Sequence, residues 1–192
     1  MRTSAHDAAP IEGAAKASLR ESEAELRERL KRGDRKAAGE FYDSHAPRVR
    51  RFIGGSLGSF GTRQDAEDLM QETFISMAEA LPFFRGESTL FTFACAIAHR
   101  KVQSFIRTGA RRARLAATID LSVESSGASS DEPLRRALDA LSPEYREVLH
   151  LKYVEDATLA DIAAIRGESE HAVESRLARA RRSLKKLVGD RR

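Results

Sequence analysis

The thirty residues Thr158–Leu187, TLADIAAIRGESEHAVESRLARARRSLKKL, decide the fold of the C-terminal part of the chain. Thr158 and Asp161 have the spacing of a capping box, which starts a helix, and Gly167 is of the type that most often ends one. Ser169 is then a natural N-cap for the last helix. The segment predicts two helices joined by a tight turn, which is a helix-turn-helix.

The last helix combines an apolar stripe with a basic face. Apolar residues recur at steps of four and three and are expected to face the domain core: Val173, Leu177, Ala180, Leu184 and Leu187. From Ser175 to Arg192, eight Lys and Arg stand against the single acid Asp190. In a helix-turn-helix the second helix reads base edges, and cations beside it contact phosphates. This pattern predicts a DNA contact; a plain helical hairpin with a solvated basic tail is the alternative.

Outside this segment the pattern is helical except for one polar stretch. Ser142 and Pro143 are suited to start the preceding helix, and Asp34 is suited to cap one near the N-terminus. Pro47 predicts a break or kink, and GGSLGSFGTRQ predicts a turn. TIDLSVESSGASSDEP cannot bury a core and predicts a linker.

The chain is therefore expected to be all-α, with two small helical domains joined by a flexible linker and a helix-turn-helix in the C-terminal one. The expected divisions are a flexible N-terminal extension (1–24), an N-terminal domain (25–108), the linker (109–131), a C-terminal domain (132–188) and a basic tail (189–192).

The composition excludes several classes of protein. The chain has 192 residues, 32% of them charged, with a net charge of +4 and a sequence pI near 9.4. This balance mildly favours an anionic partner. A single cysteine, Cys95, excludes an internal disulfide and a cysteine-rich zinc site, and the five His show no ligand spacing. Neither a secretory signal nor an apolar run of about 20 residues is present. We expect a cytoplasmic protein.

The segment DAEDLMQETFISMAEAL (65–81) predicts a helix with an acidic side. At 100° per residue, one side is apolar, while the opposite side carries carboxylates with Ile75 in their midst. An apolar residue ringed by acids is typical of a protein-binding face. A simply solvated acidic face and a Mg²⁺ site are the alternatives, and the latter would suit a nuclease.

The segment LPFFRGESTLFTFACAIAHRK (81–101) predicts a loop followed by a helix that Ser88 or Thr89 caps. On the helical wheel the core side holds Leu90, Phe91, Ala94, Cys95, Ala98, Val102 and Phe105. The other side holds Phe93, Ala96, Arg100, Gln103, Ser104 and Arg107. An aromatic beside arginines on a solvent face is typical of a nucleic-acid surface. Packing of Phe93 against a neighbouring helix is the alternative.

Four segments together resemble one known family. DAEDLMQETF, FFRGESTLFTF, LSPEYREVLHLKYVEDATLADIAAIRG and VESRLARARRSLKKL occur in the order found in the extracytoplasmic-function (ECF) group of bacterial sigma-70 family sigma factors. The resemblance covers about residues 25–188. It implies an alternative sigma factor that binds core RNA polymerase, directs it to −10 and −35 promoter elements and helps to open the DNA, without enzymatic activity of its own.

The resemblance also implies roles for individual residues. Docking on the β′ clamp helices falls to Asp65, Glu67, Asp68, Gln71, Glu72 and Ile75. Recognition and melting of the −10 element falls to Phe83, Phe84, Arg85, Gly86, Glu87, Ser88, Thr89, Phe93, Arg100, Lys101, Ser104 and Arg107. Reading of the −35 element falls to His171, Glu174, Ser175, Arg176, Arg179 and Arg182. The implied partners are core polymerase (β′ clamp helices and β flap), promoter DNA and an anti-sigma factor. The protein would join the nucleoid when bound to polymerase, with no cofactor, metal or small-molecule substrate.

Some residues depart from the family pattern. Phe93 and Arg100 stand where Trp and Asn are usual, which predicts an unusual −10 preference. Arg166, Glu168 and Glu170 stand where apolar or small residues are usual. The acids Glu168, Glu170 and Glu174 are expected to weaken phosphate attraction at the start of the recognition helix. A stand-alone helix-turn-helix regulator and an interaction module inactive on promoters are the competing interpretations.

Overall fold

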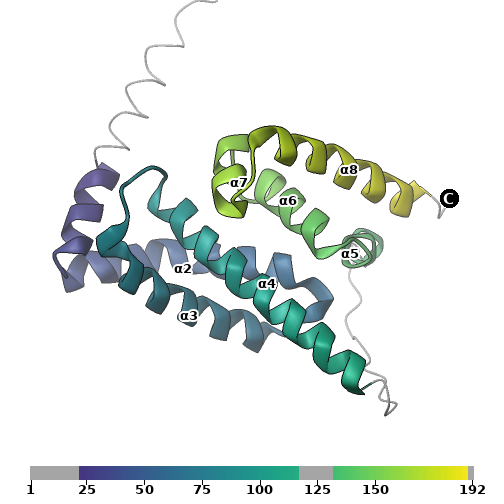
Figure 1. The fold of residues 1–192 in the computed structure, drawn as a ribbon, viewed down its shortest axis with the longest axis horizontal. Helices are drawn as coiled ribbons and strands as arrows, with labels where there is room; N and C mark the ends of the chain where they lie inside the picture. Colours follow the sequence, from purple (N-terminus) through teal and green to yellow (C-terminus); the bar gives the residue numbers. More distant parts are fainter. Residues whose placement is uncertain (1–21, 117–131, 190–192) are drawn as a thin grey trace, which may run out of the picture.

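The structure, a computed structural model, describes residues 22–116 and 132–189, and every regular element among them is a helix (Figure 1). A first helix spans residues 22–31. It is followed by α2 (Arg35–Leu57), η1 (Gly58–Phe60), α3 (Arg63–Ala80), η2 (Leu81–Phe83) and α4 (Leu90–Ala116). The C-terminal part contains α5 (Glu132–Asp139), α6 (Pro143–Tyr153), α7 (Leu159–Arg166) and α8 (Glu170–Gly189). The predicted all-α fold is confirmed. Helix α4 extends through Ala116, so residues 109–116 of the predicted linker are helical, while the rest of the linker and the end of the basic tail lie outside the described residues.

Helix starts follow the local sequence with one difference. Asp34 caps α2 by accepting from the backbone N–H groups of Lys36 and Ala37. Thr89, one of the two predicted candidates, caps α4, because its Oγ1 accepts from the backbone N–H of Thr92 at 3.0 Å. Ser142 occupies the N-cap position of α6 without a side-chain hydrogen bond to the helix.

The second helix is longer than the sequence predicts. It runs through Pro47, where a break or kink was expected, and continues through Gly54 and Gly55 to Leu57. Tertiary packing explains the extension, since the last two turns bury Phe52, Ile53, Ser56 and Leu57. Such burial outweighs the roughly 1 kcal/mol by which each glycine disfavours a helix. The Gly-rich turn is thus shorter than predicted and begins at Gly58, whose φ is +52°.

In the N-terminal part α2, α3 and α4 pack on one another around a shared core. The side of α4 predicted to face this core is buried at Leu90, Ala94, Cys95, Ala98 and Val102, whereas Phe91 and Phe105 are half-buried. The first helix rests on the same core through Leu26 and Leu30. Its described residues begin at Ser22, so part of the predicted N-terminal extension is helical.

The C-terminal part is a helix-turn-helix with two supporting helices. Thr158 and Asp161 form the predicted capping box of α7, and Gly167 ends this helix in the left-handed conformation with φ +66°. Ser169 Oγ accepts from the backbone N–H of Ala172 and so caps α8. The apolar stripe of α8 is buried at Val173, Leu177 and Ala180. The predicted motif is therefore confirmed.

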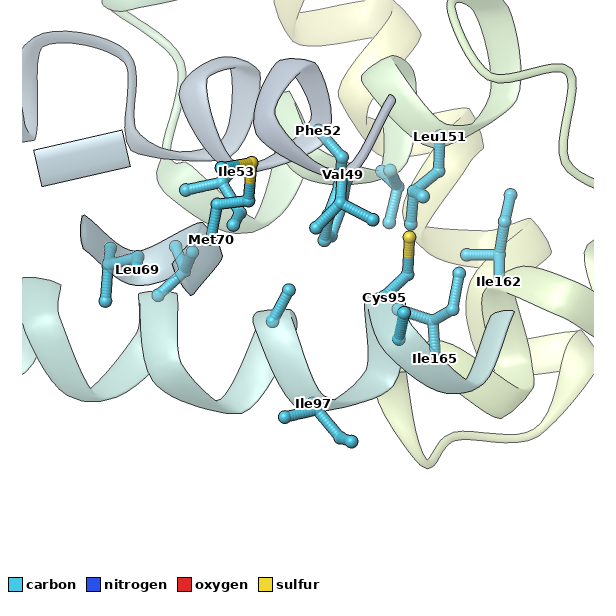
Figure 2. Close-up of a cluster of buried hydrophobic side chains, with 14 of the residues drawn as sticks. Val49, Phe52, Ile53, Leu69, Met70, Cys95, Ile97, Leu151, Ile162 and Ile165 are labelled. Carbon is cyan, nitrogen blue, oxygen red and sulfur yellow. The ribbon is translucent and has the colours of Figure 1, made fainter. Parts of the chain in front are cut away.

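The two helical domains lie against each other. Helix α6 packs on α2, and α7 packs on α4, so that one group of buried side chains spans both domains. Figure 2 shows Cys95 of α4 in this cluster with Ile162 and Ile165 of α7. Burial raises the pKa of the Cys95 thiol, which keeps the thiol protonated and favours a packing role.

The contact between α2 and α6 leads to a test with two neighbouring glycines. A Cβ on Gly55 would lie far inside van der Waals contact with the His150 ring, whereas one on Gly54 would meet nothing within 4 Å. Both changes to Ala raise helix propensity by about 1 kcal/mol. We expect Gly55→Ala to be less stable than Gly54→Ala by about 1–3 kcal/mol, the usual effect of overpacking. Urea unfolding measures the difference, and equal stabilities would contradict the close packing.

Candidate functional surfaces

One exposed stripe on α3 carries most of the predicted docking residues. Asp68, Gln71, Glu72 and Ile75 follow one another at spacings of three, one and three, which places them on one side of the helix. All four are exposed, and Ile75 is 62% exposed. An apolar side chain between carboxylates in this position can be buried by a partner while the acids pair with cations. We call these four residues the α3 face.

The other two predicted docking residues lie off this stripe. Asp65 completes a capping box with Thr62, accepting from its backbone N–H and its hydroxyl at 2.7 Å each. The backbone hydrogen bond from Thr62 lowers the pKa of Asp65. Glu67 lies 3.4 Å from Arg63 and 4.0 Å from Arg50. Both carboxylates therefore already have partners within the chain.

The loop before α4 presents aromatic side chains in two different ways. Phe83 is 83% exposed, the highest value among the exposed large hydrophobic residues. Phe84 instead stacks on Phe93, with ring centroids 4.3 Å apart and an interplanar angle of 13°. Phe93 is thus neither fully buried in the core nor fully exposed, and it forms a half-buried aromatic pair with Phe84.

The basic residues of α4 follow Phe93 further along the same helix. Arg100, Ser104 and Arg107 are exposed, as predicted for the outer side of the helix. Lys101 is only partly exposed, and its Nζ lies 3.4 Å from Glu72 of the α3 face. The exposed edge of α4 therefore continues directly into the α3 face.

Ala96 was expected on the outer side of α4 but is buried. It shares a stripe with Thr92 and His99, and both of these neighbours bond to the C-terminal domain. That stripe is covered by α6 and α7, which a wheel of the isolated helix cannot reveal. A hollow of about 320 Å³ remains at the edge of the contact, lined by His99, Arg100, Gln103, Arg107, Glu144 and Arg166.

The recognition helix α8 exposes part of its predicted reading surface. His171, Glu174, Arg179 and Arg182 are exposed, and Ser175 is half-buried. Arg176 is held inside the domain, because it donates to Glu168 from Nε and Nη2 and pairs with Glu144. Of the six predicted residues, Arg176 is thus the one whose charge has two partners within the chain.

Glu168 has partners within the chain. Burial alone would raise its pKa, but hydrogen bonds from Arg166 and Arg176 outweigh burial and lower it. The carboxylate is thereby neutralised by two guanidinium groups, which it holds away from a phosphate. Glu170 and Glu174 are exposed, and the expectation that the acids weaken phosphate attraction stays a prediction.

Two carboxylates lie at the contact between the domains, and no role was predicted for them. Glu147 of α6 is fully buried, and its Oε1 lies 2.6 Å from His99 Nδ1 of α4. Its other oxygen pairs with Arg166 of α7. The sequence does indicate that Glu147 is buried, because Glu147 lies one turn before the buried Leu151 and therefore on an apolar side of its helix.

The second carboxylate, Glu155, joins the loop after α6 to α2. Its side chain is inaccessible to solvent, and it accepts from Arg51 Nε at 2.8 Å and Arg48 Nε at 3.2 Å. Burial would raise the pKa of Glu155, but these two arginines more than compensate and lower it. His150 Nε2 lies 3.6 Å from the same carboxylate, and burial lowers the pKa of this histidine.

Arg146 adds a third polar link. Its guanidinium is buried and donates to the backbone carbonyl of Leu57 in the other domain, at 2.9 Å. It also donates to the carbonyls of Leu138, Asp139 and Leu141 between α5 and α6. One side chain thus fixes the end of α2 and the start of the C-terminal domain together.

An apolar groove of about 710 Å³ opens where the C-terminal domain meets the end of α2. Leu138, Leu149 and Leu184 line it, and the exposed Tyr153 and Val154 stand beside them. Arg181 and Lys185 of α8 add positive charge at its edge. Such a groove has the chemistry needed to receive an amphipathic helix.

Other kinds of site find no support in the part of the chain that the structure describes. Residues 22–116 and 132–189 contain no group of three or more His, Cys, Asp or Glu that could hold a metal ion. No helix in these ranges is both long and apolar enough to span a membrane.

Comparison with known proteins identifies the family. Residues 41–112 match the model for sigma-70 region 2, and residues 131–184 match the model for sigma-70 region 4. RNA polymerase sigma factor CarQ of Myxococcus xanthus is 30% identical over 169 residues, covering 85% of this chain and 95% of that protein. The chain belongs to the ECF group of sigma-70 family sigma factors.

Two further comparisons agree with this sigma-factor assignment. The ECF sigma-E factor of Escherichia coli is 26% identical over 181 residues, covering 85% of this chain and 92% of that protein. The sigma factor RpoE of Bartonella quintana, solved with the anti-sigma factor NepR, shares the fold with a TM-score of 0.65 and 23% identity. That likeness covers 80% of this chain and 98% of the other.

The Glu155 contact between the two sigma domains predicts an asymmetry between its partners. Replacing both Arg48 and Arg51 by Ala leaves a buried carboxylate unpaired, which should cost about 3–5 kcal/mol of stability. Glu155→Ala should cost less, about 1–3 kcal/mol, because the two arginines are roughly half exposed and regain water.

Arg50→Ala is the matched control for these variants. Arg50 lies in the same helix, is 42% exposed and has its nearest partner 4.0 Å away within its own domain. We expect this variant to change the free energy of unfolding by less than about 0.5 kcal/mol. Urea unfolding at constant salt compares the variants, and a larger effect of Glu155→Ala than of the double arginine variant would contradict the burial argument.

Proposed function

We propose that this sigma factor docks on the clamp helices of the polymerase β′ subunit through the α3 face. Three exposed acidic or polar side chains surround Ile75 there, and none of them is buried by the rest of the described chain. Burial of Ile75 would supply apolar contact, and Asp68 and Glu72 would supply electrostatic orientation. Asp65 and Glu67 support this face from within the chain rather than through contact with polymerase.

The observation that carries the proposed promoter function is the aromatic arrangement before α4. An almost fully exposed Phe83 stands beside the stacked pair Phe84 and Phe93, with Arg100 and Arg107 further along the same helix. Unpaired bases stack on aromatic faces, and cations pair with the phosphates between them. We assign −10 recognition and melting to residues 83–89 and this edge of α4.

Strand opening follows from the same surface. Each unstacked base costs a few kcal/mol, and a site that stacks the base again offsets this cost. The protein thus needs no chemical step of its own, because it lends polymerase a binding surface for the open state. Recognition of the −35 element would fall to α8, where His171, Glu174, Arg179 and Arg182 remain exposed.

Promoter binding also requires a change in the contact between the domains. Helices α6 and α7 cover the Thr92–His99 side of α4, directly beside the proposed −10 surface. We propose that the N-terminal domain (25–108) and the C-terminal domain (132–188) separate at this contact when the promoter is bound, with residues 109–131 connecting them.

Two protein partners are proposed for the C-terminal domain. The apolar groove beside α8 would receive an apolar element of the β flap. The structure of the B. quintana relative contains an anti-sigma factor, and we propose that the present chain is likewise held inactive by one. The sigma factor itself would act in the cytoplasm, at the nucleoid when bound to polymerase.

Reconstituted transcription tests the proposal. The purified chain is added to core polymerase with fragmented genomic DNA of its own organism, and the 5′ ends of run-off transcripts are sequenced. We expect initiation at a shared pair of promoter elements only when the chain is present. A chain that binds these fragments alone but forms no complex with core would instead be a stand-alone helix-turn-helix regulator.

Charge reversal tests the α3 face. Asp68→Lys with Glu72→Lys should weaken core binding at least tenfold, because both changes place cations where anions orient the partner. Glu25→Lys with Asp43→Lys has the same change in net charge at exposed positions elsewhere and should retain binding within about twofold. Fluorescence titration with core measures both, and equal affinities of the two double variants would contradict the assignment.

A further inference from the structure

The helix of residues 22–31 lies before the first family-model match, which begins at residue 41, yet it touches the loop proposed to melt DNA. Figure 1 shows this helix beside the segment that leads into α4. The contact is specific, because Glu23 Oε1 accepts a hydrogen bond from the backbone N–H of Leu90 at 2.5 Å. Leu90 is the first residue of α4 and lies 67 positions further along the chain.

This hydrogen bond completes the cap of α4. The first N–H groups of a helix have no partner inside it. Thr89 satisfies the N–H of Thr92, and Glu23 satisfies the N–H of Leu90. A carboxylate is favoured at this position, because the N-terminal end of a helix carries partial positive charge. The start of α4 is thus fixed partly by a residue outside its own domain core.

A second contact lies in the middle of the loop. Gly86 has φ +80°, and a Cβ at this position would overlap the guanidinium of Arg27. Arg27 therefore lies directly over the loop backbone. The left-handed conformation favours glycine here, whereas the guanidinium is the far end of a flexible side chain and could move aside for a Cβ. The stack of Phe84 on Phe93 holds the first part of the loop, so contacts reach the loop at its start, middle and end.

The helix itself is firmly held. Leu26 and Leu30 pack on the core of the N-terminal domain. Arg29 joins the far end of the helix to α2 through Asp34 at 2.9 Å and Glu40 at 3.2 Å. Glu23 and Arg27 thus act from a rigid support, which is the condition for setting the geometry of a neighbouring loop.

We propose that Glu23 and Arg27 are positioning residues for promoter melting, which hold residues 84–90 in the conformation that captures an unpaired base. This inference rests on the proposed melting function of the loop. Neither side chain needs to touch DNA, because a loop held in advance loses less conformational freedom when a base binds. We therefore expect Glu23 and Arg27 to affect promoter opening and not the binding of core polymerase.

The experiment compares open-complex formation on duplex and pre-melted promoters. Holoenzymes carrying wild-type chain, Glu23→Ala, Glu23→Gln, Arg27→Ala or Glu25→Ala are assembled on a promoter identified by the run-off selection. Reactivity of unpaired thymines with permanganate reports opening. Glu25 is exposed on the same helix and provides the control.

We expect Glu23→Ala to reduce opening of the duplex promoter about tenfold, the factor expected for loss of one hydrogen bond to a charged group. Opening on a template with a mismatched bubble should change less than twofold, and so should core affinity. Glu23→Gln retains an acceptor oxygen and should recover most of the activity, Arg27→Ala should follow Glu23→Ala, and Glu25→Ala should behave as wild type.

Equal losses on duplex and pre-melted templates would overturn the proposal, because they would indicate general loss of fold or of DNA binding. Unchanged opening by Glu23→Ala and Arg27→Ala would overturn it as well, while leaving the melting function intact. If the wild-type holoenzyme opens no promoter, the proposed function itself fails and the positioning role falls with it.

Discussion

The arrangement of the two domains depends on burying charge at their contact. Glu147 and Glu155 are both removed from solvent; Glu147 bonds to His99 of α4 and Arg166 of α7, and Glu155 pairs with Arg48 and Arg51 of α2. A buried carboxylate tolerates little displacement, because separation from its partners leaves an uncompensated charge. The same contact therefore selects one relative placement of the domains and makes separation a discrete event. The proposed separation at a promoter would need a contact of this kind, which is specific when closed and can be solvated when open.

Local sequence chemistry predicts most of the fold. The capping residues Asp34, Thr158 and Asp161 and the left-handed Gly167 lie within a few residues of the groups they bond, so their effect can be read from spacing alone. The core side of α4 and the apolar stripe of α8 follow from helical periodicity for the same reason. The family assignment also came from the sequence, because its motifs combine these local patterns in a fixed order.

The remaining features depend on residues far apart in the chain. Helix α2 continues through two glycines because of the core beneath it, and Ala96 is buried because another domain lies over it. Arg176 was predicted to contact DNA, but acids supplied by α6 and the turn hold it within the domain. Glu23 and Glu147 bond across 67 and 48 positions, distances over which spacing carries no information. The sequence thus carries no indication of the distant partners of these charged side chains.

The aromatic departure from the family pattern, Phe93, acquires a physical meaning in this setting. Phe93 has no indole N–H, so its contribution to a base or to Phe84 is limited to stacking. In the free protein Phe84 already occupies one face of the Phe93 ring, and in the proposed melting step a captured base would either add to this pair or displace Phe84. Both outcomes would depend on where the loop backbone lies, which Glu23 at the helix start and Arg27 beside Gly86 are proposed to set. The selectivity of the proposed −10 surface would then depend on the helix of residues 22–31 as much as on the aromatic residues themselves.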